Sequence, residues 1–180
     1  MTSTDVIEVY STLSHIDIHI WIDGGWGVDA LLGRQTRPHK DLDIAIQDQQ
    51  VRQFERFLAV RGYRRTKREI ERPFNFVLAD HDGREIDIHV ISIDGSGNGI
   101  YGPREDGVMY PAESLTGSGT IKGCPVRCIS PQWMVRFHSG YELTEKHYQD
   151  VSALCEKYGI APLNEFSRFK DPSLISTATG

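Results

Sequence analysis

Long apolar stretches, a surplus of basic residues and a full set of cysteine pairs are all missing from this sequence of 180 residues. No apolar run approaches the roughly 18 residues that a membrane-spanning helix needs, so we expect no membrane association. The first residues lack the basic and apolar segments of a secretory signal, which predicts a cytoplasmic protein. Three cysteines cannot all pair within one chain and are too few for a secreted disulfide scaffold.

The balance of charge is acidic. Lys and Arg number 20 against 25 Asp and Glu, which gives a formal net charge of -5. A broad nucleic-acid-binding surface normally shows a basic balance, so we expect a small-molecule substrate and no nucleic acid. The length fits one compact domain. Such a domain could also form a homodimer.

Periodicity and turn residues predict an α/β (α+β) fold, in which a short mixed sheet is flanked by helices and a helical portion ends the chain. Thr4 or Asp5 is expected to cap a first helix. Further helices are predicted at 28–32, 48–63, 131–137 and 144–158, and strands at 19–23, 41–46, 74–79, 84–91 and 126–129. Asp82-Gly83 predicts a hairpin between the third and fourth strands. Residues 92–123, rich in Gly, Pro and Ser, are predicted to form a long irregular loop.

Two carboxylates alternate on one predicted strand. Asp41 and Asp43 face one side of strand 41–46, and the other side is apolar. Carboxylate oxygens are ligands that Mg²⁺ takes together with phosphate oxygens and water. Asp87 and Glu85 lie on the polar face of a neighbouring predicted strand. We therefore predict that Asp41, Asp43 and Asp87 bind two metal ions, which would hold the attacking and leaving oxygens of an in-line displacement at phosphorus, with Asp87 or Glu85 as the general base.

A glycine turn precedes this acidic strand. Gly24-Gly25 follows an apolar strand and opens a helix, whose first amides point toward an anion such as phosphate. Two other interpretations remain: a tight strand-to-helix turn without chemistry, or the dinucleotide-binding pattern Gly25-x-Gly27-x-x-Ala30 with Asp43 or Asp48 as its ribose acid. The chain lacks the regular alternation of strands and helices that a dinucleotide-binding sheet shows.

Cationic and aromatic residues near the turn complete a nucleotide site. Arg37, His39 and Lys40 stand directly before the acidic strand, and such groups complement the charge of a triphosphate. Trp26 is predicted to stack on the base or sugar of the nucleotide. We expect His89, His138 and Tyr141 to line the pocket for the acceptor.

The stretches Trp21-Ile22-Asp23-Gly24-Gly25-Trp26-Gly27-Val28-Asp29 and Arg37-Pro38-His39-Lys40-Asp41-Leu42-Asp43 carry a resemblance to a known family. They resemble the antibiotic nucleotidyltransferases of the DNA polymerase β-like superfamily, especially small lincosamide nucleotidyltransferases and, less closely, aminoglycoside 2''-nucleotidyltransferases. The resemblance continues at 86–89, 128–130 and 137–145 and covers most of residues 20 to 150.

This resemblance implies a polymerase β-like nucleotidyltransferase fold. It also implies that Gly24 and Gly25 approach the nucleotide phosphates and that Asp41 and Asp43 bind Mg²⁺. Residues 1–92 would form the core with the metal site, and 93–162 the acceptor-binding loop and C-terminal helical portion of the same unit. Residues 163–180 would be a flexible tail. The implied reaction is Mg²⁺-dependent transfer of AMP from ATP to a hydroxyl of a lincosamide-type antibiotic, with release of pyrophosphate. Transfer to an aminoglycoside and a non-catalytic binding module are the alternatives.

Overall fold

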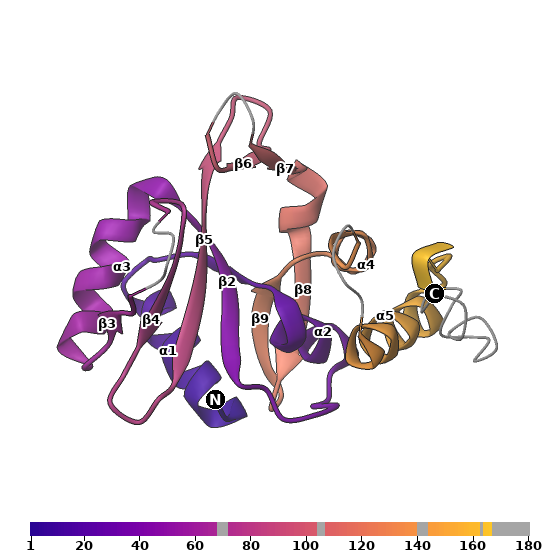
Figure 1. Cartoon of the computed structure of the whole chain (residues 1–180), viewed down its shortest axis with the longest axis horizontal. Helices are drawn as coiled ribbons and strands as arrows, with labels where there is room; N and C mark the ends of the chain where they lie inside the picture. The colour runs from indigo at the N-terminus through magenta and orange to yellow at the C-terminus, as the bar shows by residue number, and fades with distance from the viewer. Residues whose placement is uncertain (68–71, 104–106, 140–143, 163, 167–180) are drawn as a thin grey trace, which may run out of the picture.

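The computed structural model describes residues 1–67, 72–103, 107–139, 144–162 and 164–166. Within these ranges one mixed sheet of nine strands is flanked by helices, which confirms the predicted fold class (Figure 1). The helices are α1 (Ser3–His15), α2 (Gly24–Leu32), α3 (Asp48–Val60), α4 (Pro131–Phe137) and α5 (Glu145–Tyr158), with short 3-10 helices η1 (Ala112–Thr116) and η2 (Asn164–Phe166). None of the helices in these ranges has the length and apolar character needed to cross a bilayer.

The acidic strand lies in the middle of the sheet. The strands are β1 (Ile20–Ile22), β2 (Asp41–Gln47), β3 (Arg64–Arg65), β4 (Asn75–Ala79), β5 (Glu85–Ile93), β6 (Gly99–Tyr101), β7 (Val108–Tyr110), β8 (Gly117–Ile121) and β9 (Cys124–Cys128). Their order is β3-β4-β5-β2-β1-β9-β8, and β6 and β7 extend the far end of β5. Strand β2 has hydrogen-bonded neighbours on both sides: it pairs with β5 in parallel and with β1 antiparallel.

The register of β2 and β5 places their acidic residues side by side. Asp41 pairs with Glu85 and Asp43 with Asp87 across the two parallel strands. The alternate residues of β2 are fully buried, as the sequence predicts: Leu42, Ile44 and Ile46. Since side chains alternate along a strand, burial of this apolar face leaves the carboxylates of both strands on the other face.

Two helix starts differ from the sequence-based expectation. The cap of α1 is Thr2 rather than Thr4 or Asp5, and Asp5 instead closes a capping box with it. Helix α2 begins at Gly24, four residues earlier than expected, because the carboxylate of Asp23 caps the amide of Gly24 at 2.8 Å. The two glycines therefore form the first turn of the helix rather than a loop before it.

The segment 92–123 is more regular than predicted. It contains β6, β7, η1 and β8, so the expectation of a long irregular loop is wrong for its described part. These strands have only three to five residues, and each pairs with a neighbour along the chain: β6 with β5 and β7, and β8 with β9 across residues 122–123. Strands this short carry too few residues to show a period of two. In Figure 1 the β6–β7 ribbon projects from the end of β5.

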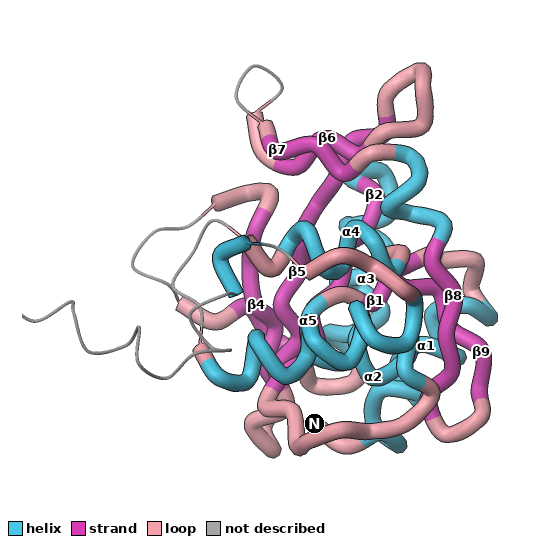
Figure 2. Tube along the Cα trace, turned by 90° about the vertical axis from the view of Figure 1, so that its right-hand side faces the viewer, coloured by secondary structure: helices cyan, strands magenta, loops and turns pink. Residues whose placement is uncertain are grey.

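Helix α5 packs against α2, and α4 lies beside both (Figure 2). The ammonium group of Lys157 donates to the carbonyl oxygens of Leu31 at 2.8 Å and Leu32 at 3.1 Å. The hydroxyl of Tyr158 donates to the same oxygen of Leu31 at 2.7 Å. The last carbonyls of a helix lack partners within it and attract cations, so these contacts fasten the C-terminal end of α2 to α5.

Candidate active site

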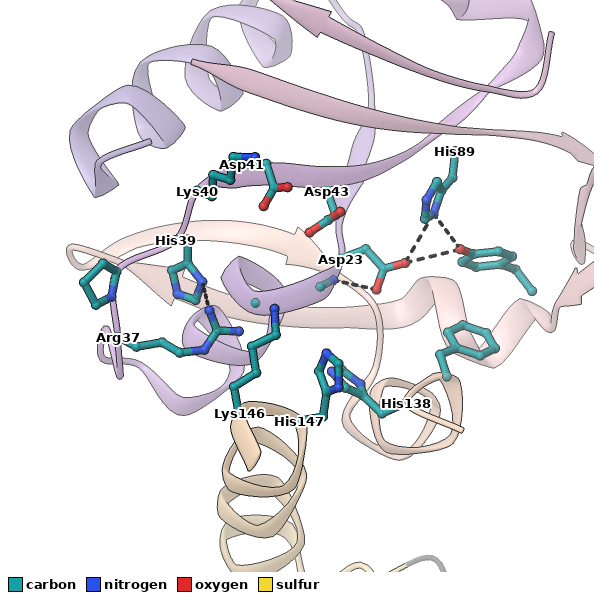
Figure 3. Close-up of a pocket in the computed structure, with 15 residues that line it drawn as sticks. Asp23, Arg37, His39, Lys40, Asp41, Asp43, His89, His138, Lys146 and His147 are labelled. Atoms are coloured by element: carbon teal, nitrogen blue, oxygen red, sulfur yellow. Dashed lines mark hydrogen bonds and ion pairs between the residues drawn. The ribbon is translucent and has the colours of Figure 1, made fainter. Parts of the chain in front are cut away.

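A cavity of about 800 Å³ opens where the acidic face of the sheet meets the start of α2 (Figure 3). Its lining comes from β1 to β2, from β5 and β7, and from the end of α4 and the start of α5: Asp23, Gly24, Gly25, Arg37, Pro38, His39, Lys40, Asp41, Asp43, His89, Tyr110, Phe137, His138, Lys146 and His147. Residues that are far apart in the sequence, from Asp23 to His147, therefore share one site.

The first wall of the cavity joins the glycine turn to the acidic strand. The backbone N–H of Asp23 donates to the carbonyl of Asp43 at 2.9 Å, and the Asp23 side chain caps α2. Gly24 has φ +54°, and a Cβ there would lie 2.7 Å from Cγ of Asp43 and closer still to Oδ2. Only glycine combines this backbone conformation with so close an approach of the carboxylate. The glycine turn and the strand that is predicted to bind metal are therefore held together as one structural unit.

Asp43 is the electrostatic centre of this wall. Burial raises the pKa of Asp43 to about 7, and the negative charges of Asp41, Asp23 and Asp87 add to the effect. Four carboxylates therefore repel one another on one face, and a cation bound among them relieves that repulsion.

The carboxylate oxygens of Asp41, Asp43 and Asp87 fit a hard divalent cation, which prefers oxygen ligands. Asp87 lies opposite Asp43 in the register and accepts a hydrogen bond from Asn75 at 3.0 Å, whereas Glu85 lies opposite Asp41. Neither lines the cavity itself. In the described part of the chain, no three acidic, His or Cys side chains converge closely enough to hold an ion as they stand.

The second wall is cationic. Arg37, Lys40 and Lys146 line it, and Figure 3 shows Lys146 rising from α5 toward the start of α2. A Cβ on Gly25 would lie 2.8 Å from Nη2 of Arg37, so this glycine lets the guanidinium lie against the helix start. The N-terminal end of a helix and three basic side chains together favour a polyanion such as a triphosphate.

The third wall is aromatic. The buried hydroxyl of Tyr110 donates to Oδ2 of Asp23 at 3.2 Å and lies 3.1 Å from Nδ1 of His89. Burial and the negative charge of Asp23 raise the pKa of the Tyr110 hydroxyl well above its usual value, so it stays protonated. The ring of Phe137 lies 4.8 Å from that of Tyr110. This wall offers apolar ring surface beside the carboxylates.

The predicted site residues divide into three groups. The structure brings eleven around or beside the cavity: Gly24, Gly25, Arg37, His39, Lys40, Asp41, Asp43, His89 and His138 line it, and Asp87 and Glu85 lie next to Asp43 and Asp41 in the register. Trp26 does not reach it, because its side chain is 1% exposed and packs on His39 with ring centroids 4.6 Å apart. Tyr141 lies outside the described residues.

Six lining residues escaped the sequence-based selection: Asp23, Pro38, Tyr110, Phe137, Lys146 and His147. Asp23 ends a buried strand directly before the two glycines, and an acid at that position is a strong helix-cap signal. Lys146 and His147 stand in the first turn of α5, over 100 residues from the glycine turn, and no local pattern distinguishes them from an exposed helix face.

Fold and site together define a nucleotidyltransferase. More particularly, the chain belongs to the aminoglycoside-2''-adenylyltransferase family, whose sequence profile matches residues 5–154. A lincosamide resistance protein of Staphylococcus haemolyticus is 30% identical over 155 residues, which are 86% of this chain and 94% of the relative. A 2''-aminoglycoside nucleotidyltransferase of Klebsiella pneumoniae is 30% identical over 169 residues, 88% of this chain and 90% of the relative.

Among solved structures, the lincosamide antibiotic adenylyltransferase LnuA with lincomycin bound is similar to this chain. The TM-score is 0.75 at 28% identity, over 89% of this chain and 99% of that one. The enzyme ANT(2")-Ia in complex with adenylyl-2"-tobramycin gives a TM-score of 0.68 at 22% identity, over 86% and 88% of the two chains, and shares the fold. The predicted membership in the antibiotic nucleotidyltransferases is confirmed.

Proposed function

We propose that this nucleotidyltransferase transfers AMP from MgATP to a hydroxyl group of a lincosamide antibiotic and releases pyrophosphate. The observation that carries the proposal is the cavity in which a carboxylate cluster, a cationic wall and an aromatic wall meet. The relative named for lincosamide resistance and the lincomycin-bound neighbour support the acceptor class.

On this proposal the donor binds between the cationic wall and the acidic strand. Arg37 and Lys146 hold the phosphates against the start of α2, and Asp41 and Asp43, with Asp87, hold Mg²⁺. The bound cations would neutralise charge that develops on the α-phosphate and on the leaving pyrophosphate. The first amides of α2 stay fixed by the Asp23 cap while the charge on the phosphates changes.

The acceptor hydroxyl then forms a bond to the α-phosphorus as the bond from that phosphorus to the pyrophosphate oxygen breaks. We propose Asp87 as the group that takes the hydroxyl proton. It lies beside Asp43 in the register, and its Oδ1 is 4.0 Å from Nε2 of His89, a residue that lines the cavity. Glu85 is the alternative base, but it lies two residue pairs away in the register, opposite Asp41, where Nζ of Lys40 is 4.0 Å from its carboxylate.

The aromatic wall favours a lincosamide over an aminoglycoside. His89, Tyr110 and Phe137 present ring surface and a neutral hydroxyl to the acceptor, whereas an aminoglycoside carries several positive charges. The three basic side chains of the cavity would repel such a polycation, and the carboxylates that would attract it are engaged by metal. Transfer to an aminoglycoside remains the second candidate, because the family profile and one full-length relative carry that name.

The test is pyrophosphate release from MgATP in the presence of a panel of lincosamides and aminoglycosides. We expect release with lincosamides, formation of an adenylylated product, and loss of both in the Asp43→Asn variant. A folded Asp43→Asn variant with near-normal turnover would contradict the metal role. Release with aminoglycosides alone would assign the second candidate. Absence of release with either class would favour an unrelated hydroxyl acceptor or a non-catalytic binding module.

A further inference from the structure

Two buried carboxylates lie next to the cavity but outside the proposed chemistry. Asp29 on α2 is 2% exposed, and Asp150 on α5 is 4% exposed. Charged side chains are almost never buried without partners, because desolvation of an unpaired charge costs too much. The partners of these two carboxylates are His39 and Arg37, the residues that the sequence predicts to bind nucleotide.

The four side chains form a continuous polar chain from α5 to α2. Asp150 accepts from Nη2 of Arg37 at 2.7 Å and from Nε at 3.4 Å. Nη1 of Arg37 lies 3.0 Å from Nδ1 of His39, and Nε2 of His39 contacts Oδ2 of Asp29. The remaining oxygen of Asp29 accepts from the amide of Thr36 at 2.9 Å and from its hydroxyl at 2.6 Å.

This arrangement assigns the proton of His39. A guanidinium can only donate, so Nδ1 of His39 accepts from Arg37 and Nε2 carries the hydrogen donated to Asp29. Both ring nitrogens are thus engaged, and the His39 side chain is 3% exposed. His39 has no free nitrogen for a phosphate in this arrangement.

Arg37 is different, because it keeps capacity for a ligand. Its side chain is 27% exposed at the cavity, and a guanidinium has five N–H groups. Two donate to Asp150 and one to His39, which leaves two for a ligand beside the start of α2. An arginine already held in place loses less rotamer entropy when it binds an anion.

We propose that Asp150, His39 and Asp29 are positioning residues that fix Arg37 for the triphosphate of the nucleotide donor. His39 acts through Arg37 rather than on the nucleotide, and helix α5 is a structural part of the donor site. The inference rests on the proposed donor, ATP, but on no particular acceptor.

The test measures the Kd of MgATP by calorimetry without acceptor, together with the Kd of lincomycin and the Tm of each variant. Asp150→Asn should weaken MgATP about tenfold or more, since a hydrogen bond to a charged group is lost, with lincomycin affinity within about twofold of wild type. The matched control is Asp80→Asn. Asp80 is also a buried carboxylate paired with an arginine, Arg84 at 2.6 Å, but it lies outside the cavity, so this variant should lose stability and keep its affinity for MgATP.

Two substitutions of His39 separate positioning from simple packing. In His39→Asn an amide oxygen can replace Nδ1 as the acceptor for Arg37, but Asp29 loses its donor. In His39→Gln the longer amide can still donate to Asp29, but Arg37 loses its acceptor. If these residues position Arg37, His39→Asn should bind MgATP more tightly than His39→Gln does, even though His39→Asn is the less stable of the two variants. A merely structural role predicts that the affinity for MgATP follows the Tm.

Unchanged MgATP affinity in Asp150→Asn, or affinities for MgATP and lincomycin that fall together with the Tm, would overturn the inference. If the wild-type protein binds MgATP but transfers nothing to lincosamides, the proposed acceptor fails while this comparison still decides the role of Asp150. A wild-type protein that binds no MgATP would refute both.

Discussion

The contact between Gly24 and Asp43 can be broken by adding a single methyl group. In Gly24→Ala the new Cβ would lie 2.7 Å from Cγ of Asp43, whereas real Cβ atoms essentially never come within 3.0 Å of a neighbour. The Asp43 side chain must therefore swing away from the glycine turn. The backbone at φ +54° adds a cost of about 1–2 kcal/mol for any residue with a side chain.

The backbone cost and the displacement of Asp43 are measured by different assays, the first by thermal unfolding and the second by turnover. The backbone cost should lower the Tm by about 2–8 °C in a chain of this length. A misplacement of a catalytic group by about 1 Å costs about 100-fold in rate, so kcat for AMP transfer should fall by about that factor. The affinity for lincomycin should change little, because its proposed wall is formed by other residues.

Gly83→Ala is the matched control for this prediction. Gly83 has φ +75° in the β4–β5 hairpin, but a Cβ there meets nothing within 4 Å. It should show a similar fall in Tm with unchanged turnover. If Gly24→Ala and Gly83→Ala lose the same stability and both keep turnover within about threefold of wild type, the close approach of Asp43 to the turn has no catalytic role.

Three further substitutions test other parts of the molecule. Tyr110→Phe removes the buried donor to Asp23 and should cost about 1.5–3 kcal/mol in chemical denaturation, with a larger rise in KM for lincomycin than for ATP; equal KM changes would argue against an acceptor wall. Burial opposes ionisation of Asp80, but hydrogen bonds from the backbone and guanidinium of Arg84 prevail and lower its pKa. Because the pKa of Asp80 is lower in the folded state, its ionised form stabilises the protein above pH 3.8, and this stabilisation is lost as the pH falls through the folded-state pKa. Asp80→Asn should therefore flatten the acid side of a Tm–pH profile, and an unchanged slope would refute this. Trp26→Phe should leave the KM for ATP unchanged, because the buried indole does not reach the cavity, whereas a severalfold rise would restore its predicted contact with the nucleotide.

The sequence predicts best those elements whose signals are local. Strict alternation from Asp41 to Ile46 places the central strand and its two faces correctly, and Asp82-Gly83 marks the hairpin between β4 and β5. Ser130-Pro131 and Thr144 likewise mark the starts of α4 and α5. In each case a few adjacent residues carry both the pattern and its physical cause.

Features without such a local signal, or that depend on distant contacts, are not predictable in this way. Strands β6, β7 and β8 pair with neighbours along the chain, but they have only three to five residues and show little β pattern of their own. The carboxylate pair Asp41 and Asp43 could be identified from the spacing of its residues alone. Asp150 could not, because only the packing of α5 on α2 brings it to Arg37 across 113 positions of the chain. Trp26 misled for a related reason: an aromatic residue beside a phosphate turn gives no sign of whether it faces the ligand or the core.

The attachment of α2 to α5 at both ends limits how this protein can be recombined with its relatives. Asp150 holds Arg37 near the first turn of α2, and Lys157 and Tyr158 hold its last carbonyls. A breakpoint between α4 and α5 would separate these partners into different parents. A chimera with that breakpoint should work only if the parent that supplies α5 also carries an acid at the position of Asp150 to hold Arg37. Helix α5 is thus tied to the start of α2, even though it lies far in sequence from the glycine turn.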